Sequence, residues 1–318
     1  MRLKGKRIVV TGCAGFIASH LTDKLLALGN EVVGIDNLSA GRVEFLVNAM
    51  DEAFELVEGD LLTMDLDPVL EGADLLCHFA ANPDVRVGAS DTRTHFDQNI
   101  EVTYRLLESC RRNGLERIMF PSTSTVYGET DVIPTPEDHG PMVPISLYGA
   151  SKLACEALIS AYCHTFEMDA VIYRFANVVG SRSTHNVLHD FIRKLGDDPS
   201  RLEILGAEPG TCKSYVHVSD CVEGMVIAVE SCEERVGIFN IGSEDRTFVK
   251  DIADIVVEEM SLSDVEYEWT GGVQGGRGWV GDVKVMLLSV DRLKSLGWAP
   301  TMGSSEAIRK AVREILKS

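Results

Sequence analysis

Short apolar runs and helical patterns alternate along the first half of the chain. Each run is rich in β-branched residues and is bounded by turn residues, which is typical of strands. The expected strands are Arg7–Thr11, Glu31–Asp36, Phe54–Glu58, Leu75–Phe79, Arg117–Pro121 and Ala170–Arg174. Between the first two runs, apolar residues recur at helical spacing from Phe16 to Leu28, and Gly29-Asn30 supplies a stop. This alternation predicts βαβ units and a parallel sheet.

The pattern loosens after Gly180. The turn-rich stretches are Gly196–Ser200, Gly206–Gly210 and Gly271–Gly278. A last helix is expected to carry Ile308, Val312, Ile315 and Leu316 on one side. We therefore expect an α/β chain in which residues 1–179 form a doubly wound parallel sheet and residues 180–318 form mainly a smaller C-terminal α/β substrate-binding region. No linker separates the two parts, so some C-terminal segments are expected to return to the first.

Composition limits the class of function. The chain has 318 residues, of which 45% are hydrophobic and 25% are charged, as in globular proteins. Its formal net charge of −19 disfavours nucleic acids and anionic membranes as partners, since both are negatively charged. No apolar run reaches the roughly 20 residues of a membrane span, and the eight cysteines are scattered without CxxC spacing. We therefore expect a cytoplasmic protein with reduced thiols, no membrane anchor and no nucleic-acid partner.

A glycine-rich turn follows the first expected strand and opens the first expected helix. Gly12, Gly15 and Ala18 are spaced as GxxGxxA. Gly12 allows a tight turn, Gly15 lets backbone N–H groups approach a pyrophosphate at the positive end of the helix, and Ala18 allows close packing of helix on strand. The strand before and the helix after this turn favour a dinucleotide-binding site of the Rossmann type over a chance spacing of glycines.

An acidic residue ends the second expected strand. The Asp36 carboxylate can accept both hydroxyls of an adenosine ribose and would repel a 2′-phosphate, so NAD is favoured over NADP. The alternative for Asp36 is a capping residue before Asn37. Asp60-Leu61, after the third strand, could meet the adenine edge, and Phe79-Ala80-Ala81, after the fourth, offers small residues beside the cofactor phosphates. Both segments could equally be strand-end packing.

A tyrosine and a lysine lie four residues apart in a helical pattern. Tyr148 and Lys152 therefore lie on one helix face. A free phenol has a pKa near ~10 and is a poor base at neutral pH, and a nearby cation lowers that pKa by favouring the phenolate. The hydroxyls from Ser122 to Thr125 follow the fifth strand, whose carboxyl end faces the ligand crevice of a doubly wound sheet. The alternatives are an exposed Tyr–Lys pair and ordinary turn chemistry.

Several segments together resemble the extended short-chain dehydrogenase/reductases. They read TGCAGFIASHL, DNLSAGR, HFAANPDVR, STSTVYG, YGASK and RFANVVGSR, and RGWVGDVKVMLLS comes late in the chain. Within that superfamily the chain is most similar to archaeal and bacterial UDP-glucose (UDP-galactose) 4-epimerases over essentially its whole length. The resemblance implies that Tyr148 is the acid/base, that Lys152 holds the nicotinamide ribose and tunes Tyr148, and that Thr123 contacts the substrate hydroxyl. Further contacts to NAD are expected at Ala14, Phe16, Ile17, Asn37, Asn99, Ser122 and Phe175.

The resemblance also implies a site for a UDP-hexose. The expected residues are Asn177 at the diphosphate, Glu203-Ile204-Leu205 at uracil, Lys213 and Arg277 as phosphate clamps, Asp282 at the uridine ribose and Met286 beside the C2 substituent of the sugar. Lys213 stands where relatives often have arginine, which replaces a bidentate fork by a point charge. Arg277 lies two residues upstream of the usual arginine position.

Two departures from the superfamily patterns bear on the reaction. Sugar-nucleotide 4,6-dehydratases typically carry Asp-Glu directly after the threonine, and decarboxylating relatives usually place Glu before Val-Tyr-Gly, whereas this chain has Ser124 and Thr125. The simplest reaction is oxidation at C4 followed by return of the hydride, which is 4-epimerisation between UDP-galactose and UDP-glucose. The alternatives are a UDP-N-acetylhexosamine or UDP-glucuronate 4-epimerase, a net NAD-dependent sugar-nucleotide dehydrogenase/reductase, and a non-enzymatic NAD-binding protein.

The sequence also bears on metal binding and on assembly of the chain. His185 and His189 lie four residues apart, but no further ligand has matching spacing, so no metal site is expected. Relatives commonly dimerise by pairing two helices per subunit. The resemblance thus implies a homodimer formed around Thr92–Arg112 and Tyr148–Phe166.

Overall fold

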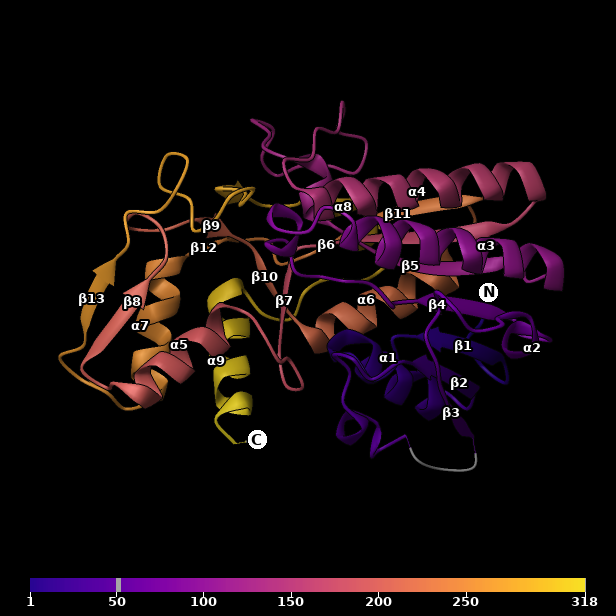
Figure 1. The fold of residues 1–318 in the computed structure, drawn as a ribbon, viewed down its shortest axis with the longest axis horizontal. Helices are drawn as coiled ribbons and strands as arrows, with labels where there is room; N and C mark the ends of the chain where they lie inside the picture. The colour runs from indigo at the N-terminus through magenta and orange to yellow at the C-terminus, as the bar shows by residue number, and fades with distance from the viewer. Residues whose placement is uncertain (50–52, 318) are drawn as a thin grey trace.

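A seven-stranded parallel sheet forms the centre of the protein, in a computed structural model that describes residues 1–49 and 53–317 (Figure 1). Its strand order is β11-β6-β5-β4-β1-β2-β3. The strands are β1 (Arg7–Thr11), β2 (Glu31–Asp36), β3 (Phe54–Glu58), β4 (Leu75–His78), β5 (Arg117–Thr123), β6 (Asp169–Phe175) and β11 (Val236–Ile241). The six predicted strands are therefore confirmed, and β5 runs two residues further than expected, to Thr123.

The direction of winding reverses at β1. The chain moves outward from β1 through β2 and β3 on one side, and then returns to β4, which pairs with the other side of β1. Helices that follow the carboxyl ends of β1 and β4 therefore leave in opposite directions. In a doubly wound sheet the ligand crevice lies at this reversal, outside the carboxyl ends of the strands.

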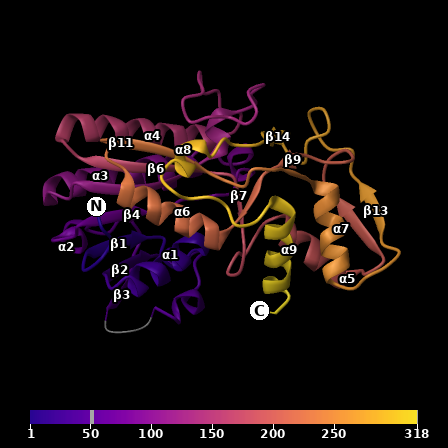
Figure 2. The same cartoon turned by 180° about the vertical axis from the view of Figure 1, so that it is seen from behind.

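Helices cover both faces of the sheet because parallel strands leave neither face for water. The helices α1 (Phe16–Ala27) and α6 (Val218–Ser231) lie together against one face, and α3 (Val102–Asn113) and α4 (Leu147–Phe166) lie against the other (Figures 1 and 2). A short helix, α2 (Asp67–Leu70), packs beside α3. The first two helices bury apolar side chains in one core and the other three in a second core.

A smaller region lies beyond the carboxyl edge of the sheet, at the left of Figure 1. Its helices are α5 (Val187–Asp197), α7 (Val249–Glu259) and α9 (Ser304–Ile315), which share a third core with β8 (Arg201–Ile204). Its short strand pairs are β7 (Asn177–Val179) with β10 (Tyr215–His217), β8 with β13 (Glu266–Trp269), and β9 (Cys212–Lys213) with β12 (Thr247–Phe248) and β14 (Val285–Met286). The predicted last helix is confirmed, with Ile308 and Val312 fully buried and Ile315 partly buried. Leu316 was also expected on this side; instead it follows the end of the helix and is exposed.

The chain crosses back to the large sheet after entering the smaller region. Residues 218–241 supply α6 and β11, and β11 adds to the sheet beside β6. A further short helix, α8 (Asp291–Lys294), packs against β11. This return is the behaviour expected for some C-terminal segments, and the boundary at residue 179 stays a prediction.

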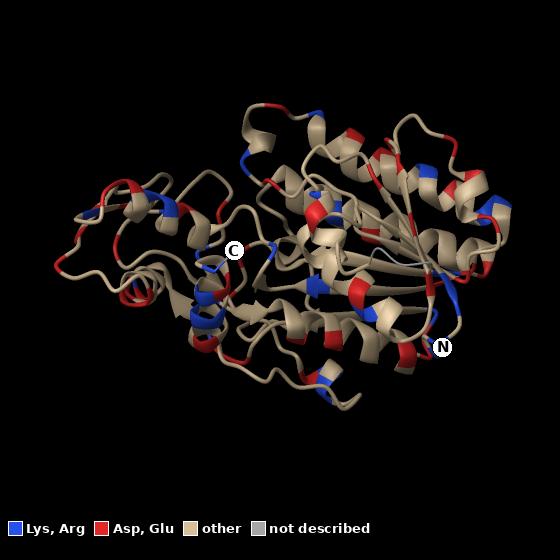
Figure 3. Cartoon of the chain, turned by 90° about the horizontal axis from the view of Figure 1, so that it is seen from below, with Lys and Arg blue, Asp and Glu red and all other residues tan. Residues whose placement is uncertain are grey.

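The structure shows where the excess acidic side chains lie and in what state the cysteines are. Acidic side chains are spread over both regions rather than gathered at one end (Figure 3). All eight cysteines are buried free thiols, and burial raises the pKa of Cys13, in the glycine turn, to about 12. Among the described helices, none is long and apolar enough to cross a membrane.

Candidate active site

One cavity of about 1270 Å³ runs along the carboxyl edge of the sheet and continues between the two regions. The sequence-predicted residues that line it are Gly12, Gly15, Phe16, Ile17, Asp36, Asn37, Asp60, Leu61, Phe79, Ala80, Ala81, Ser122, Thr123, Tyr148, Lys152, Phe175, Asn177, Glu203, Ile204, Leu205, Lys213 and Asp282. Three predicted residues do not line it: Ala14, Asn99 and Arg277. The fold therefore brings segments from residue 12 to residue 282 to one cavity.

The glycine turn leaves the start of α1 open to an anion. Gly12 has a φ of +67°, and a Cβ atom there would lie 2.8 Å from the backbone nitrogen of Ala80. Gly15 is the N-cap of α1, and this helix has no side-chain cap and no acidic residue in its first turn. Backbone N–H groups at a helix start are a binding site for phosphate. The turn thus fits a dinucleotide pyrophosphate.

The end of β2 fits the adenosine ribose. Asp36 Oδ2 accepts from the backbone nitrogen of Ala14 at 2.9 Å, and Asp36 Oδ1 accepts from that of Leu38 at 2.8 Å. A Cβ atom at Gly41 would lie 2.9 Å from both carboxylate oxygens. Asp36 thus caps a local turn and also lines the cavity, and its contact with an adenosine ribose stays a prediction. Ala14 was predicted as a direct cofactor contact; instead its amide positions the Asp36 carboxylate.

Tyr148 and Lys152 lie on the first turns of α4, whose N-cap Ser146 accepts from the backbone nitrogen of Gly149 at 3.1 Å. The Lys152 ammonium donates to the carbonyl of Pro121 at 2.9 Å, and burial lowers the pKa of Lys152 to about 8. The helix therefore anchors its lysine directly to the last residues of β5.

Burial also determines the pKa of the Tyr148 phenol. It raises the pKa of Tyr148 to about 12, and the hydrogen bond with the Thr123 hydroxyl opposes this rise. The prediction that Lys152 lowers this pKa is wrong for the protein alone, because desolvation of the phenolate outweighs the contribution of the other groups in the site. Thr123, Tyr148 and Lys152 nevertheless line the same cavity.

Asn99 is predicted to contact the cofactor, and in the structure it does not line the cavity. Its Nδ2 donates to Ser151 Oγ on α4 at 2.9 Å, and its Oδ1 accepts from the backbone nitrogen of Asn82 at 2.8 Å. Asn99 is 2% exposed. Its amide therefore ties the segment after β4 to the catalytic helix, behind the cavity wall.

The substrate end of the cavity is built around one ion pair. Lys213 Nζ lies 2.5 Å from Asp282 Oδ1 and 5.4 Å from the ring centre of Trp279. Asn177 also lines this part, and its Nδ2 donates to the carbonyl of Ser214 at 3.0 Å. Met286 is buried and lines the cavity.

Arg277, the predicted second clamp, is bonded to Glu129 and does not line the cavity. Its Nη2 pairs with Glu129 Oε2 at 2.5 Å, and its Nε donates to the carbonyl of Asp282 at 2.9 Å. The Glu129 carboxylate draws the guanidinium away from the cavity. Nothing near Arg277 in the sequence indicates Glu129 as its partner, and the clamp role stays a prediction.

Several residues that sequence reasoning did not assign also line the cavity. They include Arg86, Ser124, Thr125, His189, Arg193, Tyr215 and Trp279. Ser124 and Thr125 belong to the hydroxyl-rich segment that was singled out, so that segment carried a signal for them. Trp279 belongs to the segment RGWVGDVKVMLLS, which was also singled out, but its residue type gave no sign of a place in the cavity.

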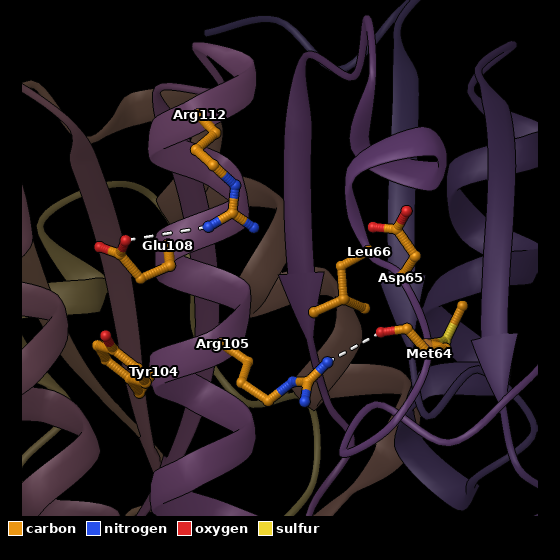
Figure 4. Close-up of a pocket in the computed structure, with 7 residues that line it drawn as sticks. All are labelled: Met64, Asp65, Leu66, Tyr104, Arg105, Glu108 and Arg112. Atoms are coloured by element: carbon orange, nitrogen blue, oxygen red, sulfur yellow. Dashed lines mark hydrogen bonds and ion pairs between the residues drawn. The ribbon is translucent and has the colours of Figure 1, made fainter.

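The described residues form no metal site, and a second, smaller hollow belongs to helix packing. Within the described ranges, no three His, Cys, Asp or Glu side chains form a group that could hold a metal ion. His189 Nε2 lies 2.9 Å from Ser183 Oγ. A smaller hollow of about 270 Å³ lies between α3 and the segment before α2 (Figure 4). Arg105 and Arg112 there are bonded to the carbonyl of Met64 and to Asp67, so the hollow belongs to the packing of α2 and α3.

Comparison with known proteins agrees with this geometry. The family model "NAD dependent epimerase/dehydratase family" matches residues 8–242. A "Putative UDP-glucose 4-epimerase" of Methanocaldococcus jannaschii is 30% identical over 96% of this chain and 97% of its own length. A crystal structure of a UDP-galactose 4-epimerase is 43% identical, with a TM-score of 0.87 over 98% of this chain and 99% of that one.

A further solved structure contains ligands. The UDP-glucuronic acid 4-epimerase of Bacillus cereus, in complex with UDP-glucuronic acid and NAD, is 28% identical with a TM-score of 0.87 over 98% of this chain and 99% of that one. These matches confirm the resemblance to the extended short-chain dehydrogenase/reductases and the Rossmann-type fold class. The chain belongs to the NAD dependent epimerase/dehydratase family.

Proposed function

We propose that the protein is a UDP-sugar 4-epimerase that interconverts UDP-galactose and UDP-glucose. One observation carries the proposal: a single cavity is lined by the glycine turn, by Tyr148, Lys152 and Thr123, and by Lys213 with Asp282. A dinucleotide, a reacting sugar and a nucleotide diphosphate therefore have adjoining places. The similar epimerases described above support the same activity.

The chain's own residues handle the proton of the reaction. Thr123 orients the 4-hydroxyl of the sugar, and Tyr148 takes its proton as the general base and later returns it to the same oxygen. Lys152 holds positive charge beside the site and binds the nicotinamide ribose. When bound, NAD supplies a hydride acceptor and donor at C4 and a positive ring charge that favours the phenolate of Tyr148.

Anchoring of the UDP moiety at one end of the cavity allows the configuration at C4 to be inverted at the other end. Lys213 and Asp282 hold the UDP moiety, while the 4-keto sugar turns about the diphosphate and presents its other face. Binding energy from the unreacting UDP keeps the ketone in the site during this turn. Hydride return to the second face then inverts C4 without net redox change.

The residues after Thr123 favour epimerisation over dehydration. Ser124 and Thr125 line the cavity with hydroxyl groups, which are poor general acids and bases near neutral pH. Proton removal from C5 needs a stronger base at that place. The reaction therefore stops at exchange of configuration at C4.

Product analysis tests the proposed function. Purified protein is incubated with UDP-galactose without added NAD, and UDP-glucose is quantified by chromatography, with UDP-N-acetylgalactosamine and UDP-glucuronate in parallel. Turnover of the plain hexose supports the proposal. Turnover of only an N-acetyl or uronate sugar moves the specificity to that substrate. Stoichiometric NADH with added NAD identifies a net dehydrogenase, and no turnover with NAD supplied overturns the epimerase.

The two basic residues near the diphosphate should differ in effect. Lys213→Ala removes a charge-assisted hydrogen bond to phosphate worth about 1.5–3 kcal/mol, so KM for UDP-galactose should rise by about 10–100-fold. Arg277→Ala should change KM little, because Glu129 and the carbonyl of Asp282 already engage the guanidinium. Equal effects on the dissociation constant of UDP, measured by calorimetry, would contradict this assignment.

Cofactor choice should depend on one carboxylate. Asp36→Ser removes the charge that repels a 2′-phosphate, and the affinity for NADP relative to NAD should rise by at least about tenfold. Calorimetric dissociation constants for both cofactors check this. Asp60→Ser is the matched control, since Asp60 also lines the cavity. If both variants shift the ratio equally, general charge and not Asp36 sets the preference.

We also propose a homodimer in the cytoplasm. The helices α3 and α4 lie side by side on one outer face, where Tyr104 and Phe166 are each 45% exposed. Two copies that pair these helices would cover both rings. Sedimentation should give twice the 34.8 kDa of one chain, and a single-chain mass would refute the dimer.

A further inference from the structure

A buried ion pair lies directly behind the catalytic residues, and the proposed reaction makes no use of it. Glu156 on α4 is 4% exposed and Arg174 on β6 is 1% exposed. Arg174 Nη2 lies 2.7 Å from Glu156 Oε2, and Arg174 Nε lies 3.1 Å from Glu156 Oε1. Desolvation makes such a pair costly unless its remaining hydrogen-bonding groups are satisfied. The other hydrogen-bond partners of Glu156 and Arg174 therefore indicate the role of this ion pair.

Those partners come from the elements that carry the site. Ser122, at the carboxyl end of β5, donates its hydroxyl to Glu156 Oε1 and is paired with Arg174 in the sheet register. Arg174 Nη1 donates to the Tyr127 hydroxyl and to the carbonyl of Glu137, both at 2.9 Å. The catalytic helix, β5, β6 and the turn after β5 are thus joined through one carboxylate and one guanidinium.

The position of Glu156 on α4 connects this network to the catalytic pair. Tyr148, Lys152 and Glu156 follow one another at intervals of four residues and share one helix face. Lys152 Nζ donates to the carbonyl of Pro121, the residue before Ser122. The lysine and the glutamate therefore attach successive turns of α4 to successive residues of β5. Thr123, which meets Tyr148, is the next residue of that strand.

We propose that Glu156 is a positioning residue for the epimerisation: held by Arg174 and Ser122, it fixes α4 in the register that places Tyr148 and Lys152 against the end of β5, and its carboxylate places a negative charge one helical turn from the Lys152 ammonium. The kinetic part of this inference rests on the proposed function. The register and the charge are properties of the folded chain.

The electrostatic surroundings of Lys152 support the second part. Burial lowers the pKa of Lys152 to about 8, and electrostatic interactions with Cys155 and then with Glu156 act in the opposite direction. Burial raises the pKa of the Cys155 thiol, so Glu156 is the negatively charged neighbour near neutral pH. The other titratable groups that face it are Tyr148 on the same helix and His78 on β4, whose pKa burial lowers to about 3, so that its ring is neutral. The cationic form of Lys152 is the useful one, so activity is present below its pKa and is lost as pH rises through it.

Glu156→Gln tests the proposal by removing the charge while keeping the size of the side chain. It also leaves Arg174 positive and unpaired, and both changes lower the pKa of Lys152. The alkaline limb of kcat against pH should therefore move to lower pH. Displacement of a catalytic group by about 1 Å can cost 10²-fold, so we expect kcat at pH 7 to fall by at least about tenfold with little change in KM.

Two variants separate charge from register. Glu156→Asp keeps the charge but is one methylene shorter, so the alkaline limb should return to its wild-type pH while kcat stays reduced. Ser122→Ala leaves the ion pair intact and should lower kcat without moving the limb. These two carry the test if Glu156→Gln does not fold. If Glu156→Asp and Ser122→Ala both retain the wild-type kcat, Glu156 does not set the register of α4 against β5.

The matched control is a buried carboxylate on the other face of the sheet. Asp220 on α6 is 5% exposed and accepts from the backbone nitrogen and the hydroxyl of Thr301, both at 2.8 Å. Asp220→Asn should lower Tm while leaving kcat and the pH profile unchanged. If Glu156→Gln behaves in the same way, Glu156 is only structural and the proposal falls.

A readout without substrate keeps the inference apart from the proposed function. The pKa of Lys152 is measured by NMR titration of ¹³Cε-labelled lysines, with the resonance assigned by Lys152→Met. It should fall in Glu156→Gln relative to wild type, and an unchanged value overturns the charge argument. A wild-type protein that turns over no UDP-sugar refutes the epimerase, and this titration still decides the role of Glu156.

Discussion

Replacement of Tyr148 by phenylalanine should lower kcat for the interconversion of UDP-galactose and UDP-glucose by about 10³-fold, within the usual range for a lost general acid/base. Phenylalanine keeps the ring and removes the only group of that side chain that can carry the proton. Since Tyr148 lies beside Thr123, which influences its pKa, and Lys213 and Asp282 form their own ion pair, the affinity for UDP should be unchanged. Chromatographic rates and calorimetric UDP binding check the two halves.

Tyr162→Phe is the matched control for this prediction. Tyr162 lies on the same helix, and its hydroxyl donates to Glu108 Oε1 at 2.7 Å, outside the cavity. The same chemical change there should leave kcat unchanged. A Tyr148→Phe protein that retains near wild-type kcat would remove the tyrosine from the reaction and require another base.

The second large effect concerns the glycine turn. Gly12→Ala should weaken NAD binding by about 10–100-fold, the value of one charge-assisted hydrogen bond at about 1.5–3 kcal/mol. An added Cβ would lie 2.8 Å from the backbone nitrogen of Ala80 and 2.9 Å from its Cα, where real Cβ atoms do not fit. The turn must shift, and its backbone N–H groups then move away from the pyrophosphate. Calorimetric titration with NAD measures the loss.

A second glycine separates the clash from backbone strain. Gly29, at the other end of α1, also has a positive φ of +82°, but a Cβ there meets nothing within 4 Å. Gly29→Ala should therefore lower stability by about 1–3 kcal/mol through strain alone, as Gly12→Ala does in part, and leave NAD affinity intact. Equal NAD affinities in the two variants would show that the contact with Ala80 is irrelevant.

Local chemistry made the first half of the fold readable from the sequence. The strands from Arg7–Thr11 to Phe54–Glu58 have the predicted bounds because alternating strands and helices impose distinct apolar periods on a short stretch of chain. The turn at Gly12 and the carboxylate of Asp36 were readable for the same reason. Each role is set by the residue's place at the end of one strand.

Contacts between residues far apart in the sequence decided which partners the polar side chains of the site bind. Arg277 was expected at the phosphates, but Glu129, 148 residues earlier, holds its guanidinium. Asn99 was expected at the cofactor, but Ser151 on α4 takes its amide. Polar side chains are drawn to whichever partner the folded backbone places within about 3 Å, and sequence spacing carries no record of that distance.

The sequence by itself determined the family, the order of the first strands and a set of site residues most of which line the cavity. Only the tertiary structure decided the pKa values and the hydrogen-bond partners of these residues. Burial, and not the nearby lysine, sets the pKa of Tyr148, and the contact of Ser122 with Glu156 joins positions 34 residues apart. The physical reason is that residue type and local period are written along the chain, whereas desolvation and hydrogen-bond partners arise only when distant segments pack together.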